Sequence, residues 1–411
     1  MKAVAAVIIV LCLTLLFIGG AALAESVESI ESTESIESAG STQSSEPLTT
    51  AAIQSQAESL LDTFDLTAWQ RVADSMLAPT QRISVRDTIL RIIQGERVLD
   101  GATALERILQ ALFQSLRSSA GLIIQLIVPA LLCAILSRMR AAFENDPVSQ
   151  ACQFVGYALV ALIAARFFLA QLAQVRSVVD GIATGMQALF PLLLTLLAAV
   201  GGTASSAFFQ PAVVAASGTM TAMVQKVTLS FALATALVTI LTHISPNVGL
   251  SRLRSLLKTI ANWSLGICFT VFIGVMAVQG MGAAAFDGVT MRTAKYAIDN
   301  FVPIVGGMMA DTMDTLIACS LLVKNALGIT GLVLLASYCV APLMQALSAS
   351  LVFRFCAAAL EPVADGPIVD LLGDFAGSVT MLFTVLLAVA AMFFLLVAQL
   401  LLVGNLTVML R

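Results

Sequence analysis

The pattern of hydrophobic positions divides this chain into four regions. Residues 3–23 are almost entirely apolar, residues 25–52 are polar, residues 53–118 carry apolar residues at helical spacing, and residues 119–411 consist mostly of long apolar stretches. A helix needs about 20 apolar residues to cross a bilayer. The pattern therefore predicts an all-α, polytopic membrane protein with an N-terminal signal peptide and a small exported helical segment ahead of its membrane domain.

The first region is typical of an export signal. Lys2 precedes the apolar stretch, and Ala22-Leu23-Ala24 fits the small-x-small rule for signal-peptide cleavage. We expect residues 1–24 to be removed by cleavage between Ala24 and Glu25, with an uncleaved first transmembrane helix as the alternative. In both cases the chain that follows begins outside the cytoplasm.

The polar region that follows is rich in glutamate and serine. Residues 25–52 begin ESVESIESTESIES and contain no bulky apolar cluster. Because like charges and serine cannot offset the entropy lost on ordering, this composition predicts a disordered linker.

Residues 53–118 predict short amphipathic helices on the extracytoplasmic side. Ser84 with Asp87, and Thr103 with Glu106, have the spacing of helix-capping pairs ahead of apolar runs. The last helix should continue without a break into the first span at about residue 119. We expect the apolar stripes to pack on each other as a small cap; docking to a partner or to the membrane surface is the alternative.

Seven to nine membrane spans are predicted in residues 119–411. Two apolar stretches, 207–224 and 301–322, are interrupted by proline, glycine or aspartate and are either spans or re-entrant segments. The clear candidates are 119–137, 152–173, 184–201, 227–243, 262–284, 326–348 and 378–403.

Basic residues indicate the orientation only weakly. With the mature N-terminus outside, the first span brings Arg138 and Arg140 to the cytoplasm, in agreement with the positive-inside rule. Arg176, Lys226 and Arg354 would fall on the outside and oppose this assignment.

Composition excludes most soluble functions. Hydrophobic residues make up 59% of the chain and charged residues 11%, where about 25% charged is usual for soluble domains. Residues 25–118 hold 7 Lys/Arg and 14 Asp/Glu, whereas residues 119–411 hold 13 and 11. Neither part has the basic stripe that nucleic-acid binding requires, so no nucleic-acid partner is predicted.

The residue inventory also excludes common catalytic chemistry. His243 is the only histidine, so multi-histidine metal sites are impossible, and no G-K-[ST] sequence is present to form a P-loop. We predict no catalytic residue, no metal and no cofactor.

Charged residues concentrate between residues 287 and 324, where seven fall within 38 positions of an otherwise apolar domain. A charge buried in hydrocarbon costs about 2.5–3.5 kcal/mol, so these side chains should form ion pairs or line a polar path. A solvated loop over residues 285–300 is the alternative for some of them. Pro303, Gly306 and Gly307 predict a helix break at membrane depth. The candidate residues, with Arg166 from an earlier span, are Arg166, Asp287, Arg292, Lys295, Asp299, Asp311, Asp314 and Lys324.

Several of these stretches resemble the stage III sporulation protein AE family of endospore-forming bacteria. The resemblance covers about residues 60–405 and is carried by DGVTMRTAKYAIDNFVPIVGG, LLVKNALGITGL, RLRSLLKTIANWSLGICFTVFIGV and EPVADGPIVDLL. It implies a multi-pass protein of the mother-cell membrane that surrounds the forespore. It also implies a secretion-like channel complex with other stage III A-operon membrane proteins, which supports late forespore development under sigma G.

The residues and the resemblance together predict a non-enzymatic membrane subunit that acts by assembly. Its predicted partners are the lipid bilayer and the other stage III A-operon proteins, and homo-oligomerisation is left open. A secondary transporter for a small solute is the alternative function. A transporter of that kind would show two related halves, and no such repeat is found in the sequence.

Overall fold

The computed structural model describes residues 56–61, 66–76, 84–94, 101–142, 147–244, 249–301, 306–363 and 366–409. These residues form helices joined by turns, with no strand among them. The prediction of an all-α membrane protein is therefore confirmed. The predicted signal peptide, its cleavage site between Ala24 and Glu25, and the linker over residues 25–52 lie outside the described residues.

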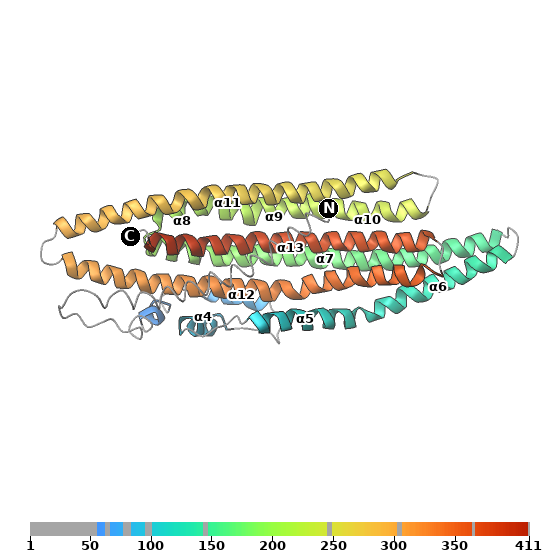
Figure 1. Cartoon of the computed structure of the whole chain (residues 1–411), viewed down its shortest axis with the longest axis horizontal. Helices are drawn as coiled ribbons and strands as arrows, with labels where there is room; N and C mark the ends of the chain where they lie inside the picture. Colours follow the sequence, from blue (N-terminus) through green and yellow to red (C-terminus); the bar gives the residue numbers. More distant parts are fainter. Residues whose placement is uncertain are drawn as a thin grey trace.

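Long helices lie side by side along one axis as an elongated antiparallel bundle (Figure 1). Three shorter helices come first, namely α3 (Thr67–Met76), α4 (Val85–Ile93) and α5 (Gly101–Ser118). The long helices are α6 (Ala120–Ala142), α7 (Pro147–Ala199), α11 (Ser251–Phe301), α12 (Gly306–Leu360) and α13 (Gly366–Met409). A composite rod between α7 and α11 consists of α8 (Thr203–Val214), the π-helical turns Ala215–Met220 and Val224–Thr228 on either side of α9 (Thr221–Met223), and α10 (Leu229–Ile244).

The described residues contain six helices that are long and apolar enough to cross a membrane, fewer than the seven to nine spans predicted. The difference arises because stretches predicted as separate spans are joined into single helices. In α7 the stretches 152–173 and 184–201 are continuous, since the intervening residues 174–183 contain no proline and include good helix formers such as Gln174 and Arg176. The stretches 207–224 and 227–243 are joined in the composite rod, and most of 301–322 is joined to 326–348 in α12.

These helices are longer than one bilayer requires. The 55 residues of α12 and the 53 of α7 correspond to about 80 Å of helix at 1.5 Å per residue. The hydrocarbon core of a bilayer is about 30 Å thick. A helix of this length along the membrane normal therefore extends well beyond the bilayer.

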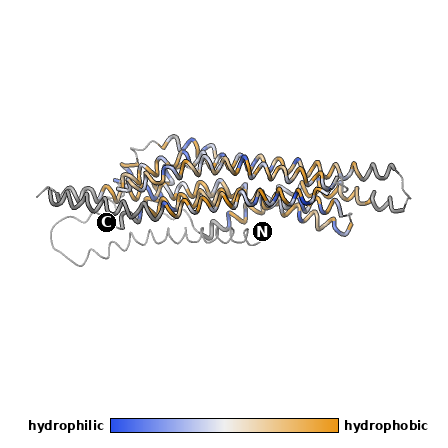
Figure 2. Tube along the Cα trace, turned by 90° about the horizontal axis from the view of Figure 1, so that it is seen from above, coloured by the Kyte–Doolittle hydropathy of each residue, from blue (hydrophilic) through white to orange (hydrophobic). Residues whose placement is uncertain are grey.

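Helix α13 forms the centre of the bundle and packs against α7, α10, α11 and α12. An aromatic cluster joins three of these helices: the ring of Phe353 on α12 lies 6.1 Å from that of Phe375 on α13, and Phe168 on α7 lies 6.2 Å from Phe375. All three side chains are fully buried. The coloured trace in Figure 2 is mainly hydrophobic along its length, as expected for a bundle whose interior and lipid-facing exterior are both apolar.

The helices before residue 118 pack on the long helices more than on each other. The indole of Trp69 on α3 is 1% exposed and lines a small cavity with Ile182 and Met186 of α7 and Leu334 of α12. Helices α4 and α5 lie along α12. The apolar stripes predicted to form a cap on their own thus face α7 and α12. Helix α5 ends at Ser118 and α6 begins at Ala120, so the helix predicted to continue without a break is interrupted at Ser119 alone.

Candidate functional site

The charged stretch predicted from the sequence is helical where the structure describes it. Asp287, Arg292, Lys295 and Asp299 lie on the last part of α11, and Asp311 and Asp314 lie on the first turns of α12. The structure describes the helical backbone of these residues but not the placement of their side chains. Residues 285–300 are therefore a continuation of α11 and not an irregular loop.

The glycines of the predicted helix break are helical. Gly306 and Gly307 form the first turn of α12, and Pro303 falls within residues 302–305, outside the described residues.

Arg166 lies on the outer surface of α7. Its side chain is exposed, and within the described residues no ion pair to it is found. The structure therefore places this arginine where lipid, water or a partner reaches it, and does not bring it together with Lys324.

Lys324 is a fully buried cation in the core. Its exposure is 0%, and its ammonium Nζ donates to the backbone carbonyls of Leu401 at 3.1 Å and Leu400 at 3.4 Å, both on α13. No carboxylate pairs with it among the described side chains. The carbonyl dipoles of α13 thus provide its hydrogen bonds in place of water.

Two neighbouring positions make room for Lys324 and reinforce the contact. Gly404 has no side chain, and a Cβ at this position would come within 1.6 Å of Lys324 Nζ. Asn325, the next residue on α12, donates from Nδ2 to Oδ1 of Asn405 at 3.0 Å. These two contacts, Lys324 with Gly404 and Asn325 with Asn405, thus fix the last turns of α13 to α12.

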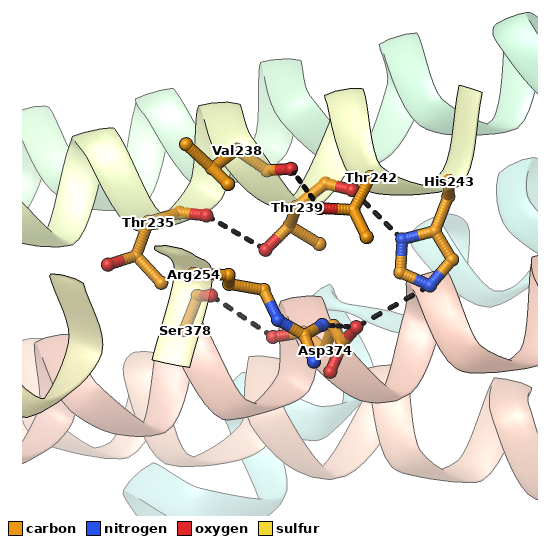
Figure 3. A network of polar contacts seen from close by, with 8 residues as sticks. All are labelled: Thr235, Val238, Thr239, Thr242, His243, Arg254, Asp374 and Ser378. Carbon is orange, nitrogen blue, oxygen red and sulfur yellow. Dashed lines mark hydrogen bonds and ion pairs between the residues drawn. The ribbon is translucent and has the colours of Figure 1, made fainter. Parts of the chain in front are cut away.

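A second polar cluster joins α10, α11 and α13 (Figure 3). The carboxylate of Asp374 on α13 forms an ion pair with the guanidinium of Arg254 on α11, and lies 3.5 Å from Nε2 of His243 on α10. The other imidazole nitrogen, Nδ1, is 2.9 Å from the carbonyl oxygen of Thr239. The carboxylate is 28% exposed, so water reaches part of the cluster.

The cluster fixes helices and does not have the arrangement of a hydrolytic site. Both nitrogens of His243 face an oxygen that has no proton to give up, one in a carboxylate and the other in a backbone carbonyl. Nearby hydroxyls on α10 donate to carbonyls of their own helix: Thr239 donates to Thr235 O and Thr242 to Val238 O, at 2.8 and 2.7 Å. A general base needs a free nitrogen within reach of a nucleophile.

Sequence reasoning missed this cluster. In the sequence His243 stands out only as the single histidine, and Asp374 is not singled out. The available signal was the pair Asp370 and Asp374, two acidic residues one turn apart at the start of an otherwise apolar helix. The structure also places Arg354 near Arg254, since Arg354 contacts Thr380 and Arg254 contacts Asp374 on α13.

Groups of metal ligands and interior cavities among the described residues bear on metal and solute binding. The described residues contain no group of three or more His, Cys, Asp or Glu residues that could hold a metal ion. Two small cavities lie between helices, each about 10 Å³, which is room for about one water molecule.

Comparison with known proteins identifies the family. A family model described as Stage III sporulation protein AE matches residues 83–404. The chain belongs to this family. It is 31% identical over 328 residues to the Stage III sporulation protein AE of Bacillus subtilis (strain 168), with 80% of this chain and 82% of that protein covered. No solved structure matches the chain significantly. Membership of the stage III sporulation protein AE family confirms the resemblance predicted from the sequence.

Proposed function

We propose that this protein is a non-enzymatic integral membrane subunit of a sporulation-specific, secretion-like channel complex that links mother cell and forespore. The observation that carries the proposal is the family match, which extends over nearly the whole long-helix bundle. In this proposal the protein resides in the mother-cell membrane around the forespore. It assembles there with other stage III A-operon membrane proteins and is required for late forespore development.

The packing of the bundle supports action by assembly. Two cavities between the described helices each hold about one water molecule. A path for larger molecules would therefore form between this protein and its partners, or between copies of it. The exposed charge of Arg166 and the charged stretch from Asp287 to Asp314 are our candidates for surfaces that line such a path.

The exported segment supports the proposed orientation. Helices α3, α4 and α5 cover α7 and α12 over positions such as Met186 and Leu334. Lipid cannot reach a surface that these helices cover. We therefore assign this part of the bundle to the extracytoplasmic side, where it would face the space between the two membranes and contact partners.

A gene deletion tests the proposal. In the endospore-forming host, loss of the gene should leave vegetative growth normal and stop sporulation after engulfment, with late forespore gene expression reduced. Expression of the intact gene from a second locus is the control and should restore spore yield. Normal spore yield in the deletion strain would refute the proposed function.

The secondary-transporter alternative predicts an activity of the isolated protein. A stand-alone transporter would drive ion-dependent uptake of a small solute when the purified chain is reconstituted in liposomes. We expect no such uptake, because the chain belongs to a sporulation-protein family and the two interior cavities described above each hold about one water molecule.

A further inference from the structure

Cations from α11 and α12 converge on one face of α13 near the connection between α10 and α11. The guanidinium of Arg254 pairs with Asp374. One turn further along α11, Lys258 Nζ lies 2.9 Å from the place that a Cβ on Gly377 would occupy. From α12, Arg354 Nη2 donates to Thr380 Oγ1 at 3.4 Å.

These contacts follow one another along α13. Gly377 lies three residues from both Asp374 and Thr380 and is therefore a neighbour of each on the surface of the helix. Each step is about 4.5 Å along the axis, at 1.5 Å per residue. Lys258 and Arg354 thus contact positions of α13 that are about 4.5 Å apart along the helix axis, so one phosphate group could be reached by both cations.

The charges along this face are not balanced. Asp374 pairs with Arg254 and Asp370 also lies close to it, but neither carboxylate forms an ion pair with Lys258 or Arg354. The cations nearest to Lys258 are Arg254 and Arg354, and both repel it. The side chain of Lys258 is only half exposed. Arg354 is exposed and therefore accessible from outside the bundle. Because two adjacent cations without a counter-ion repel each other, an anion from outside the chain would stabilise them.

The surroundings indicate that this anion belongs to a lipid. On α12, Phe355 beside Arg354 is 59% exposed and Leu351 is 44% exposed; on α11, Ile260 is 37% and Trp263 68% exposed. Exposed side chains of this kind face acyl chains in a membrane protein, and tryptophan is enriched at the boundary between headgroups and acyl chains. Basic pockets between transmembrane helices are a recurrent mode of binding acidic headgroups.

We propose that Lys258 and Arg354 bind the phosphate of an anionic phospholipid headgroup over the Gly377–Thr380 turn of α13. The acyl chains of this lipid lie along the exposed apolar side chains of α11 and α12. The inference requires a membrane location and is independent of the proposed sporulation channel.

Native mass spectrometry of the full-length protein tests this site. The purified protein in mild detergent is titrated with phosphatidylglycerol, phosphatidylcholine or inorganic phosphate, and bound adducts are counted. The native protein should prefer phosphatidylglycerol to phosphatidylcholine by about tenfold or more, since each cation attracts the anionic headgroup. The double variant Lys258→Gln/Arg354→Gln should lose this preference.

Matched variants separate this site from a general effect of charge. Arg252→Gln removes an exposed cation from the same end of α11 and should leave the preference unchanged. The exchange Lys258→Arg/Arg354→Lys keeps both charges and should retain most of it. Equal preference in the double glutamine variant would overturn the proposal. So would competition by inorganic phosphate at the same apparent affinity, because the site would then take a free anion.

A measurement on the unaltered protein covers the case in which the double glutamine variant does not fold. Photoreactive phosphatidylglycerol should label peptides from the first part of α11 and the last part of α12 in preference to others. Labelling spread evenly over the lipid-accessible helices would contradict a specific site.

Discussion

Lys324 shows how an unpaired cation is held inside an apolar bundle. Its ammonium is hydrogen bonded by backbone carbonyls of α13, and the missing side chain at Gly404 leaves the space that Nζ occupies. The Lys324 side chain can occupy this position only because residue 404 is glycine. The two positions should therefore be energetically coupled.

A double-mutant cycle tests that coupling. Gly404→Ala should lower the thermal midpoint of the purified protein, because the new methyl overlaps Lys324 Nζ. In a Lys324→Met background, which lacks Nζ, Gly404→Ala should reduce the free energy of unfolding by less than it does in the native protein. The two losses should differ by about 1 kcal/mol or more. Gly373→Ala on the same helix is the control, since nothing lies within 4 Å of its Cβ position. Equal losses in both backgrounds would contradict the contact.

Charges near the α11–α12 connection give a second prediction at the residue scale. Lys295→Leu and Asp311→Leu should each stop forespore development without preventing membrane insertion, because both remove a charge proposed to serve a polar path. Spore yield and membrane-fraction blotting measure the two effects. Lys295→Arg and Asp311→Glu keep the charges and should sporulate. Normal spore yield in both leucine variants would contradict the proposal that these charges serve a polar path.

At the scale of elements, the position of α3 against the long helices depends on one large side chain. Trp69 is almost fully buried against α7 and α12, whereas Trp263 is 68% exposed on α11. The chain has only these two tryptophans, so each serves as the other's control.

Trp69→Ala should release α3 from the bundle. Truncation of a buried tryptophan costs about 3–5 kcal/mol, which exceeds what a 10-residue helix gains on its own. Limited proteolysis should then cut near α3 while α6 to α13 stay intact. Trp263→Ala should leave the cleavage pattern unchanged. If the Trp69→Ala variant resists proteolysis as well as the native protein does, α3 is held by other contacts.

The sequence predicts which stretches are helical better than it predicts which stretches form one continuous helix and which helices pack together. Continuous apolar stretches identify the helices, and Ser84 with Asp87 correctly marks the start of α4, where Ser84 Oγ accepts from Asp87 N. The length of α7 is not predictable from apolarity, because Gln174 and Arg176 interrupt the apolar stretch without breaking the helix. Long-range partners such as Arg254 with Asp374 could not be predicted, since they depend on which helices pack together.

At the scale of the whole molecule, the antiparallel order of the six apolar helices sets which connections share a side (Figure 1). The start of α11 and the end of α12 lie at one end of the bundle, and the start of α8 lies at the other. If each helix crosses once, these ends are on opposite faces of the membrane.

Cysteine labelling tests this topology. In a background without accessible native cysteines, Ser251→Cys and Glu361→Cys should react with an impermeant maleimide from the same side, and Thr203→Cys from the opposite side. All three positions are exposed. Labelling of Ser251→Cys and Glu361→Cys from opposite sides would contradict the six-helix arrangement.

The central claim is that the protein works as one subunit of a membrane complex. A crosslinking pull-down from sporulating cells, with an affinity tag on this chain and an unrelated multi-pass protein as the control bait, measures this most directly. We expect the other stage III A-operon membrane proteins to be recovered with the tagged chain and not with the control. Recovery of the crosslinked chain without any of them, from cells in which they are present, would contradict the account.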